Sequence, residues 1–189
     1  GATGENTASW VPQNTVAAAD EAVLRKLRKA GVLVLPVAAG SNYLQVSFVN
    51  VPTPDAETWQ LLHQLSLQLL SLDLARVTLH DEDLALLSDC QTLYELSLRN
   101  SNITSTGIAK LAPLTGLQKL NISNTTMGDD AVPALTKLAG LREIFVFGTP
   151  LTAAGHQQLR TDDVVQAAQH AKAQQQRGLG QQGQGTHVA

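Results

Sequence analysis

The side chains that most often carry out chemistry are few in this chain, and they form no catalytic pattern. None of the five histidines belongs to an H-E-x-x-H motif or pairs with a cysteine: His63, His80, His156, His170 and His187. Neither a G-x-S-x-G sequence nor a phosphate-binding loop occurs. A serine nucleophile needs a histidine base within reach, and the spacing indicates no such pair. The sequence therefore predicts a protein that is not an enzyme and that holds no cofactor.

Two further features invite a chemical interpretation, and both have a structural one. The acidic run Asp81-Glu82-Asp83 follows His80 and could hold a cation, but it is also typical of a first helical turn, which the helix dipole favours. Cys90 is the single cysteine, so the chain can form neither an internal disulfide nor a C-x-x-C zinc site. Because Cys90 lies on an apolar face, we interpret it as a small core residue. No metal site is predicted.

Composition narrows the class of protein. The 189 residues are enough for one domain with tails, and an aromatic content of only 4% predicts an aliphatic core. A net charge of −3 argues against binding to a nucleic-acid backbone, which needs a basic surface. No apolar run reaches the roughly 20 residues that span a bilayer, so we expect no membrane insertion of this segment.

The middle of the chain repeats with a period of 24 residues, the step from Leu93 to Leu117. Seven positions of this period carry matching residues in successive copies, among them Leu93/Leu117/Leu141, Leu96/Leu120/Ile144, Leu98/Ile122/Val146 and Ile103/Met127/Leu151. In each copy L-x-L places both apolar side chains on one face of a short strand, and apolar residues three apart then follow at helical spacing. We expect the hydroxyls of the turn at Ser101, Thr125 and Thr149 to bond backbone groups, and Thr104 and Thr152 to be helix N-caps.

One unit cannot be stable by itself. About six buried aliphatic side chains contribute roughly 9–18 kcal/mol, whereas ordering 24 residues costs on the order of 24–48 kcal/mol. Neighbouring units must cover both open faces, so the copies are predicted to stack as a solenoid with Leu96, Leu120 and Ile144 as adjacent rungs. The pattern resembles leucine-rich repeats of a 24-residue bacterial type. The resemblance implies an α/β solenoid with a parallel sheet on the concave face, helices on the convex face and an N-terminal helical cap.

Four segments are predicted along the chain. Residues 1–14 are expected to be disordered or left by trimming of a longer chain, and residues 15–66 to form the cap and a degenerate first repeat. The leucine-rich repeats occupy residues 67–160. Residues 161–189 are expected to form a C-terminal helix and a disordered tail rich in Gln and Gly.

A second resemblance concerns location. GVLVLPVAAGSNYLQVSFVN, residues 31–50, followed by this repeat type, is similar to a region of bacterial envelope proteins that also carry a c-type cytochrome domain. It implies a periplasmic or secreted protein, and it offers an alternative function: an accessory domain of a periplasmic redox protein that positions a haem domain or binds its substrate, which could be a carbohydrate. The haem-binding motif itself is absent from this sequence.

The candidate binding residues are those that alternate with the buried strand positions and so point to the concave side. They are Asp73, Ser97, Arg99, Asn121, Ser123, Phe145 and Phe147. The two phenylalanines are either an interaction patch or a surface that the C-terminal helix covers as a cap. We therefore predict a non-catalytic module of the bacterial cell envelope. Its concave sheet would bind a protein partner or an adjacent domain of its parent protein.

Overall fold

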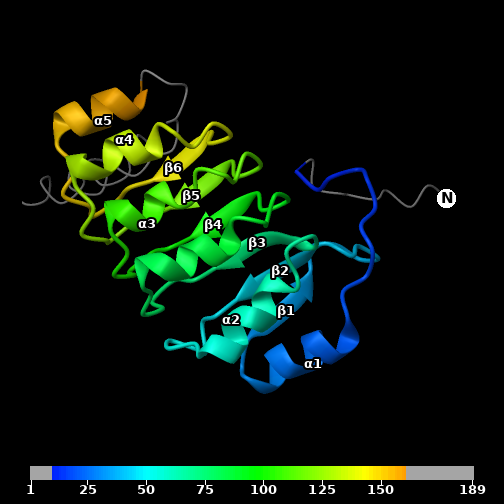
Figure 1. The fold of residues 1–189 in the computed structure, drawn as a ribbon. Helices are drawn as coiled ribbons and strands as arrows, with labels where there is room; N and C mark the ends of the chain where they lie inside the picture. The colour runs from blue at the N-terminus through cyan, green and yellow to red at the C-terminus, as the bar shows by residue number, and fades with distance from the viewer. Residues whose placement is uncertain (1–9, 161–189) are drawn as a thin grey trace, which may run out of the picture.

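The computed structural model describes residues 10–160, which form one elongated body of stacked strand–helix units (Figure 1). The predicted C-terminal helix and tail lie outside these residues. In chain order the elements are α1 (Glu21–Lys29), β1 (Leu33–Pro36), β2 (Leu44–Ser47), α2 (Ala56–His63), β3 (Leu69–Asp73), the 3₁₀ helix η1 (Asp81–Leu87), β4 (Glu95–Ser97), α3 (Ser105–Ala109), β5 (Lys119–Asn121), the 3₁₀ helix η2 (Asp129–Ala131), α4 (Val132–Leu135), β6 (Glu143–Phe145) and α5 (Ala153–Arg160).

The six strands form a single sheet in the order of the sequence, and the repeat positions stand in register. Leu96 pairs with Leu120 and Leu120 with Ile144, as the period predicts. From β2 to β6 all neighbours are parallel, while β1 pairs antiparallel with β2. The short turn at 37–43 accounts for this difference from an all-parallel sheet, because a parallel partner would need a longer crossover.

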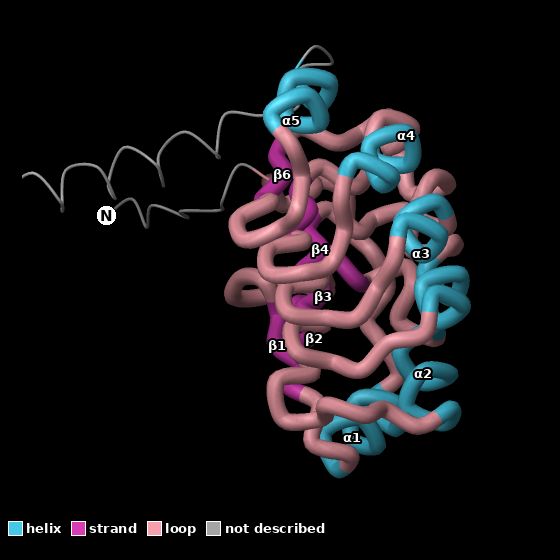
Figure 2. The backbone as a smooth tube through the Cα atoms, turned by 90° about the vertical axis from the view of Figure 1, so that its left-hand side faces the viewer, coloured by secondary structure: helices cyan, strands magenta, loops and turns pink. Residues whose placement is uncertain are grey.

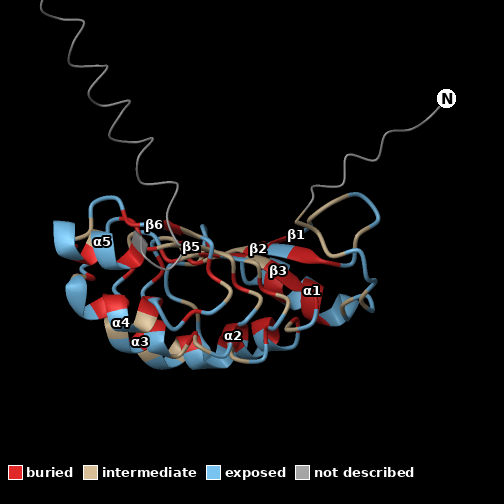
Figure 3. Cartoon of the chain, turned by 90° about the horizontal axis from the view of Figure 1, so that it is seen from above, coloured by how far each residue is buried: buried red, intermediate tan, exposed pale blue. Residues whose placement is uncertain are grey.

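The core lies between the sheet and the row of helices (Figure 3). It is one continuous, predominantly aliphatic cluster that runs from Val23 to Leu159. Cys90 is fully buried in it, as predicted, and burial raises the pKa of its thiol to about 12. The few aromatic residues of the core are at the N-terminal end, where the ring of Trp59 stacks on Phe48 with centroids 5.6 Å apart.

A helix closes each end of the described solenoid. At the N-terminal end α1 packs against β1 and α2, and its buried side is formed by Val23, Leu24 and Leu27. At the other end α5 is displaced from the helix row and lies above β6 (Figure 2). Leu159 of α5 is 2% exposed, and Ile144 of the last strand is fully buried. These two helices cover apolar faces that an internal repeat would cover with its neighbour.

The polar corners that follow the strands satisfy the backbone locally. The hydroxyls of Ser101, Thr125 and Thr149 each donate to the carbonyl oxygen three residues earlier, at 2.7, 2.7 and 2.8 Å. This confirms the predicted role of the hydroxyl position. The residue before each of the first two hydroxyls has a positive φ, 56° at Asn100 and Asn124, a conformation that asparagine tolerates better than most residues.

At two places along the solenoid, an aspartate carboxylate of one unit is hydrogen-bonded to a threonine of the next unit. Asp81 accepts hydrogen bonds from the backbone N–H and the hydroxyl of Thr104, the N-cap of α3 in the next unit. Two periods further along the chain, Asp129 accepts the same two bonds from Thr152, at 2.8 and 2.6 Å. The acidic run around Asp81 thus supplies a structural bond between units, and its place at the start of η1 agrees with a first-turn position.

Candidate functional site

The outward face of the sheet, here called the concave face, carries three rows of side chains fixed by strand register. The row nearest the strand starts is Leu35, Gln45, Ser71, Glu95, Lys119 and Glu143. The middle row is Leu33, Ser47, Asp73, Ser97, Asn121 and Phe145. The third row, two residues further on, is Ala75, Arg99, Ser123 and Phe147. With strands about 4.8 Å apart, the first two rows, which run from β1 to β6, each span roughly 24 Å.

The predicted binding residues do fall on this face, but they are not equally available. Phe147 is 64% exposed and Phe145 36%, and Arg99 is exposed. Ser123 is only 7% exposed, although its neighbours in the row, Arg99 and Phe147, are exposed. Its expected role as an accessible contact is therefore not supported by its position. Helix α5 leaves both phenylalanines exposed, and the predicted C-terminal helix, the alternative cover for them, lies outside the described residues.

The polar centre of the face is partly occupied by its own hydrogen bonds. Asp73 accepts from the hydroxyl of Ser47 at 3.2 Å and from the backbone N–H of Ala75 at 3.0 Å. Asn121 likewise accepts from the backbone N–H of Ser123 at 2.9 Å. These bonds fix the side-chain oxygens, so the centre presents small, pre-oriented polar groups.

Sequence reasoning missed two parts of the face. Leu33 and Leu35 of the edge strand β1 are 45% and 42% exposed on it, because the antiparallel pairing places them beside Ser47 and Gln45. The first row also carries an ion pair between Lys119 and Glu143 at 3.4 Å. This row could have been predicted from the L-x-x-L spacing. The residue just before the second leucine, such as Glu95 before Leu96, must also point outward. The face is thus apolar at both ends and polar between them.

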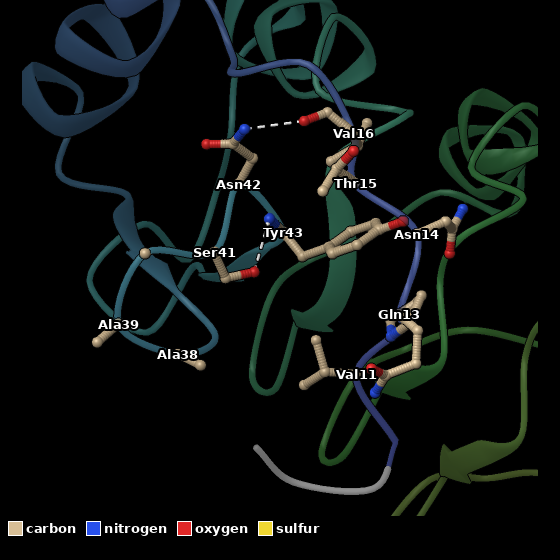
Figure 4. Close-up of a pocket in the computed structure, with 12 residues that line it drawn as sticks. Val11, Gln13, Asn14, Thr15, Val16, Ala38, Ala39, Ser41, Asn42 and Tyr43 are labelled. Carbon is tan, nitrogen blue, oxygen red and sulfur yellow. Dashed lines mark hydrogen bonds between the residues drawn. The ribbon is translucent and has the colours of Figure 1, made fainter. Parts of the chain in front are cut away.

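A second feature lies beside the sheet, where residues 10–17 cross the starts of β2, β3 and β4. We call this segment the N-terminal arm. The ring of Trp10 stacks on Tyr94 with centroids 5.5 Å apart. Farther along, the amide of Asn42 donates to the carbonyl of Val16 at 2.8 Å, and that of Gln68 donates to Ala17 at 3.0 Å. Between the arm and the turn at 38–43 lies a cleft of about 410 Å³ (Figure 4).

The histidines of the described residues serve local structure. The Nδ1 of His63 lies 3.1 Å from the carbonyl oxygen of Leu86, and the ring of His80 lies 3.4 Å from the carboxylate of Asp83. The charge of His156 helps to hold the pKa of Asp129 below its usual value, after the two hydrogen bonds from Thr152. His170 and His187 lie outside the described residues. Within residues 10–160 no group of three or more His, Cys, Asp or Glu side chains is arranged to hold a metal ion.

None of the helices in the described part of the chain combines the length and apolarity needed to cross a bilayer. No protein-family model matches the sequence, and no curated protein matches it significantly.

Three solved bacterial structures are similar in fold. A leucine-rich-repeat protein of Leptospira interrogans is 21% identical with a TM-score of 0.38, over 53% of this chain and 25% of its own. An internalin of Listeria monocytogenes is 17% identical with a TM-score of 0.39, over 57% and 37%. Internalin C2 of the same organism is 16% identical with a TM-score of 0.38, over 67% and 74%. The chain thus spans well under half of the first two.

The fold itself is identified by the chain's own repeats. Units of one period, each with a short strand, a corner and a helical segment, stack with their strands in register, and the corner carries a hydroxyl in the units of β4, β5 and β6. This chain folds as a leucine-rich-repeat solenoid.

Proposed function

We propose that this chain is a protein-interaction module that binds its partner through the concave face. The observation that carries the proposal is the exposed pair Phe145 and Phe147, which lies at one end of the face beside its polar centre. An exposed phenylalanine gains most of its burial free energy only when a partner covers it. Aromatic residues are also enriched among the residues that dominate binding energies at interfaces.

The remainder of the face is suited to specificity. Serine, asparagine and aspartate side chains held by their own hydrogen bonds offer donors and acceptors at fixed positions. Because these side chains are already ordered, they lose little conformational entropy when a partner binds. Arg99 and Glu95 are exposed charges of opposite sign on β4 and its extension. Such charges favour partners with complementary charge and speed association more than they strengthen it.

We further propose that the module works in the bacterial cell envelope, outside the cytoplasmic membrane. Support for this location comes from the resemblance of residues 31–50 to envelope proteins. The alternative role, as an accessory domain of a c-type cytochrome protein, rests on that same resemblance alone. A C-x-x-C-H motif elsewhere in the full-length gene would favour the alternative, and a gene with only a leader sequence and these repeats would favour a free-standing module.

The experiment that tests the binding face compares substitution of an exposed hydrophobic residue on the sheet face, Phe147, with substitution of one on the helix layer, Leu86. The chain is used to capture partners from native envelope extracts, which are identified by mass spectrometry, and the affinity is then measured for Phe147→Ser. We expect at least about a tenfold weakening, equivalent to about 1.4 kcal/mol, with no change in melting temperature.

The matched control is Leu86→Ser in η1, which replaces a side chain 41% exposed on the helix layer and should leave the affinity unchanged. If Phe147→Ser instead lowers the melting temperature by several degrees, the phenylalanine packs against this chain and the binding proposal is wrong. Equal weakening by both variants would also contradict it.

A further inference from the structure

The cleft between the N-terminal arm and the turn at 38–43 is a separate feature from the concave face. Its walls are residues 11–16 on one side and 38–43 on the other. Figure 4 shows the side chain of Tyr43 pointing from the turn toward the arm, with Val11 and Gln13 opposite Ala38 and Ala39. A volume of about 410 Å³ falls within the range of small-molecule sites and corresponds to roughly a dozen water molecules.

The lining of the cleft selects for uncharged molecules. None of its twelve residues is an Asp, Glu, Lys, Arg or His. A charged ligand would lose hydration without meeting an opposite charge, which is strongly unfavourable. The polar side chains of the lining include the amides of Gln13, Asn14 and Asn42 and the hydroxyls of Thr15 and Ser41, which can both donate and accept hydrogen bonds. The Asn42 amide already donates to the carbonyl of Val16, and the Ser41 hydroxyl already accepts from the N–H of Tyr43, so Gln13, Asn14 and Thr15 are the main groups for a ligand.

These groups fit an amide better than a sugar. An amide ligand offers one acceptor and one or two donors in a plane, which matches side-chain amides pair for pair. A sugar ring usually also needs an exposed aromatic face to stack on. Tyr43 is only 3% exposed, so its ring is already covered by the protein. The mixture of Val11, Pro12, Ala38 and Ala39 with the amides suits a short peptide with small side chains.

The arm is held to the repeats by the stacking of Trp10 on Tyr94 and by side-chain hydrogen bonds. Within the described residues it forms no strand pairing with the sheet. Its hydrogen bonds to the repeats run from the side chains of Asn42 and Gln68 to two arm carbonyls. At the tip of the opposite turn Gly40 has a φ of 75°, and a Cβ there would meet nothing within 4 Å, so this position faces open space.

An acceptor without a partner lies next to this region. Gln68 is 6% exposed, and its Oε1 has no hydrogen-bond partner among the described residues although its Nε2 binds the arm at Ala17. The backbone carbonyl of Gln68 also accepts from the N–H of Leu44, the residue after Tyr43. Gln68 is not one of the residues that line the cleft, so this acceptor bears on the attachment of the arm and not on the ligand.

We propose that this cleft is a binding site for a small uncharged ligand that carries peptide-type amides, with the arm as one of its walls. This site is independent of the concave face, so either proposal can fail alone. The probe is N-acetyl-L-alanine N-methylamide, titrated into the ¹⁵N-labelled chain and followed by amide chemical shifts. Acetate, methylammonium and glucose are titrated in parallel.

The expected result is a saturable change in amide chemical shift that is confined to residues 11–16 and 38–43. The dissociation constant should be about 1 mM, which is typical for a ligand of this size. Acetate, methylammonium and glucose should shift these residues at least about tenfold less. Ala38→Leu and, separately, Ala39→Leu fill the cleft and should weaken binding about tenfold. The control Ala112→Leu, at a half-buried alanine after α3, should not.

Melting temperatures of the three variants establish that each is folded, and the two cleft positions provide a result even if one variant is unstable. Scattered or non-saturating shifts with the neutral diamide would overturn the proposal. So would equal binding of acetate or methylammonium. Preferential binding of glucose would replace the amide class by a carbohydrate and overturn the assignment of the ligand.

Discussion

Replacing Gly107 by alanine tests the carboxylate bond between units, because two well-known effects predict opposite signs. Gly107 lies inside helix α3, where glycine is about 0.5–1 kcal/mol less favourable than alanine. Helix propensity alone therefore predicts that Gly107→Ala raises the free energy of unfolding. However, a Cβ at this position would stand 2.5 Å from Oδ1 of Asp81 and 3.2 Å from Cγ2 of Ile103.

The carboxylate cannot move away freely, because it holds the N-cap of α3. Asp81 accepts from the backbone N–H of Thr104 at 3.0 Å and from its hydroxyl. Loss of both bonds costs about 2 kcal/mol, since hydrogen bonds to charged groups are the stronger kind and these are partly exposed. After subtracting the propensity gain, we expect Gly107→Ala to destabilise the chain by about 1 kcal/mol, a fall in melting temperature of about 2–4 °C.

The chain contains its own control for this reasoning. One period further on, Ser105 takes the place of Asp81 and Ala131 takes the place of Gly107. An alanine is thus present where the facing side chain is the shorter serine. The double variant Asp81→Ser/Gly107→Ala reproduces that pair. Relative to Asp81→Ser alone, adding Gly107→Ala should stabilise by about 0.5–1 kcal/mol.

The assay is urea unfolding followed by circular dichroism, with all four chains of the double-mutant cycle measured in the same buffer. We expect the effect of Gly107→Ala to change sign between the two backgrounds. This change of sign is expected because the Asp81 carboxylate leaves no room for a Cβ at position 107. A stabilising Gly107→Ala in the native background, or an equal effect in both backgrounds, would refute this explanation.

Three further outcomes follow from the structure. Cys90 should not react with a thiol reagent in the folded chain and should react fully in denaturant, because its thiol is buried with a pKa of about 12; reaction at a normal rate in the native state would contradict this. The pKa of Asp129 is lowered in the folded state, chiefly by the bond from the Thr152 hydroxyl, so its stabilising contribution is present above about pH 4 and is lost as the pH falls through the folded pKa. Asp129→Asn should therefore flatten the decrease of melting temperature below about pH 4, and an unchanged decrease would count against it. Leu120→Ala, at a fully buried rung with a strand on either side, should destabilise by about 2–5 kcal/mol in urea unfolding, and a loss below about 1 kcal/mol would mean that the rung is not tightly packed.

Much of the candidate binding face could be predicted from the sequence because strand alternation is a local rule. Once Leu96 and Leu98 are buried, Ser97 and Arg99 must point to the other side. That rule correctly placed Phe145 and Phe147 on the concave face. It could not determine exposure, because alternation fixes only the side of the sheet, and Ser123 is 7% exposed while Phe147 in the same row is 64% exposed.

The edge strand and the N-terminal arm lay beyond the repeat pattern. Leu33 and Leu35 join the face only because β1 turns back antiparallel, and a short apolar run does not specify the direction in which a strand pairs. Trp10 meets Tyr94 although the two are far apart in the sequence, and no period connects them. The cleft beside the arm is a product of such long-range contacts.

The sequence by itself determined the solenoid, its register and its hydroxyl corners. Each unit repeats the same short-range pattern, and a side chain need only match its copy one period away for the units to stack. The tertiary structure alone decided which face residues are accessible, how the two ends are closed and where the arm crosses the strands. These features depend on single contacts between segments that share no pattern, and the free energy of such contacts is set by shapes that meet only in the folded chain.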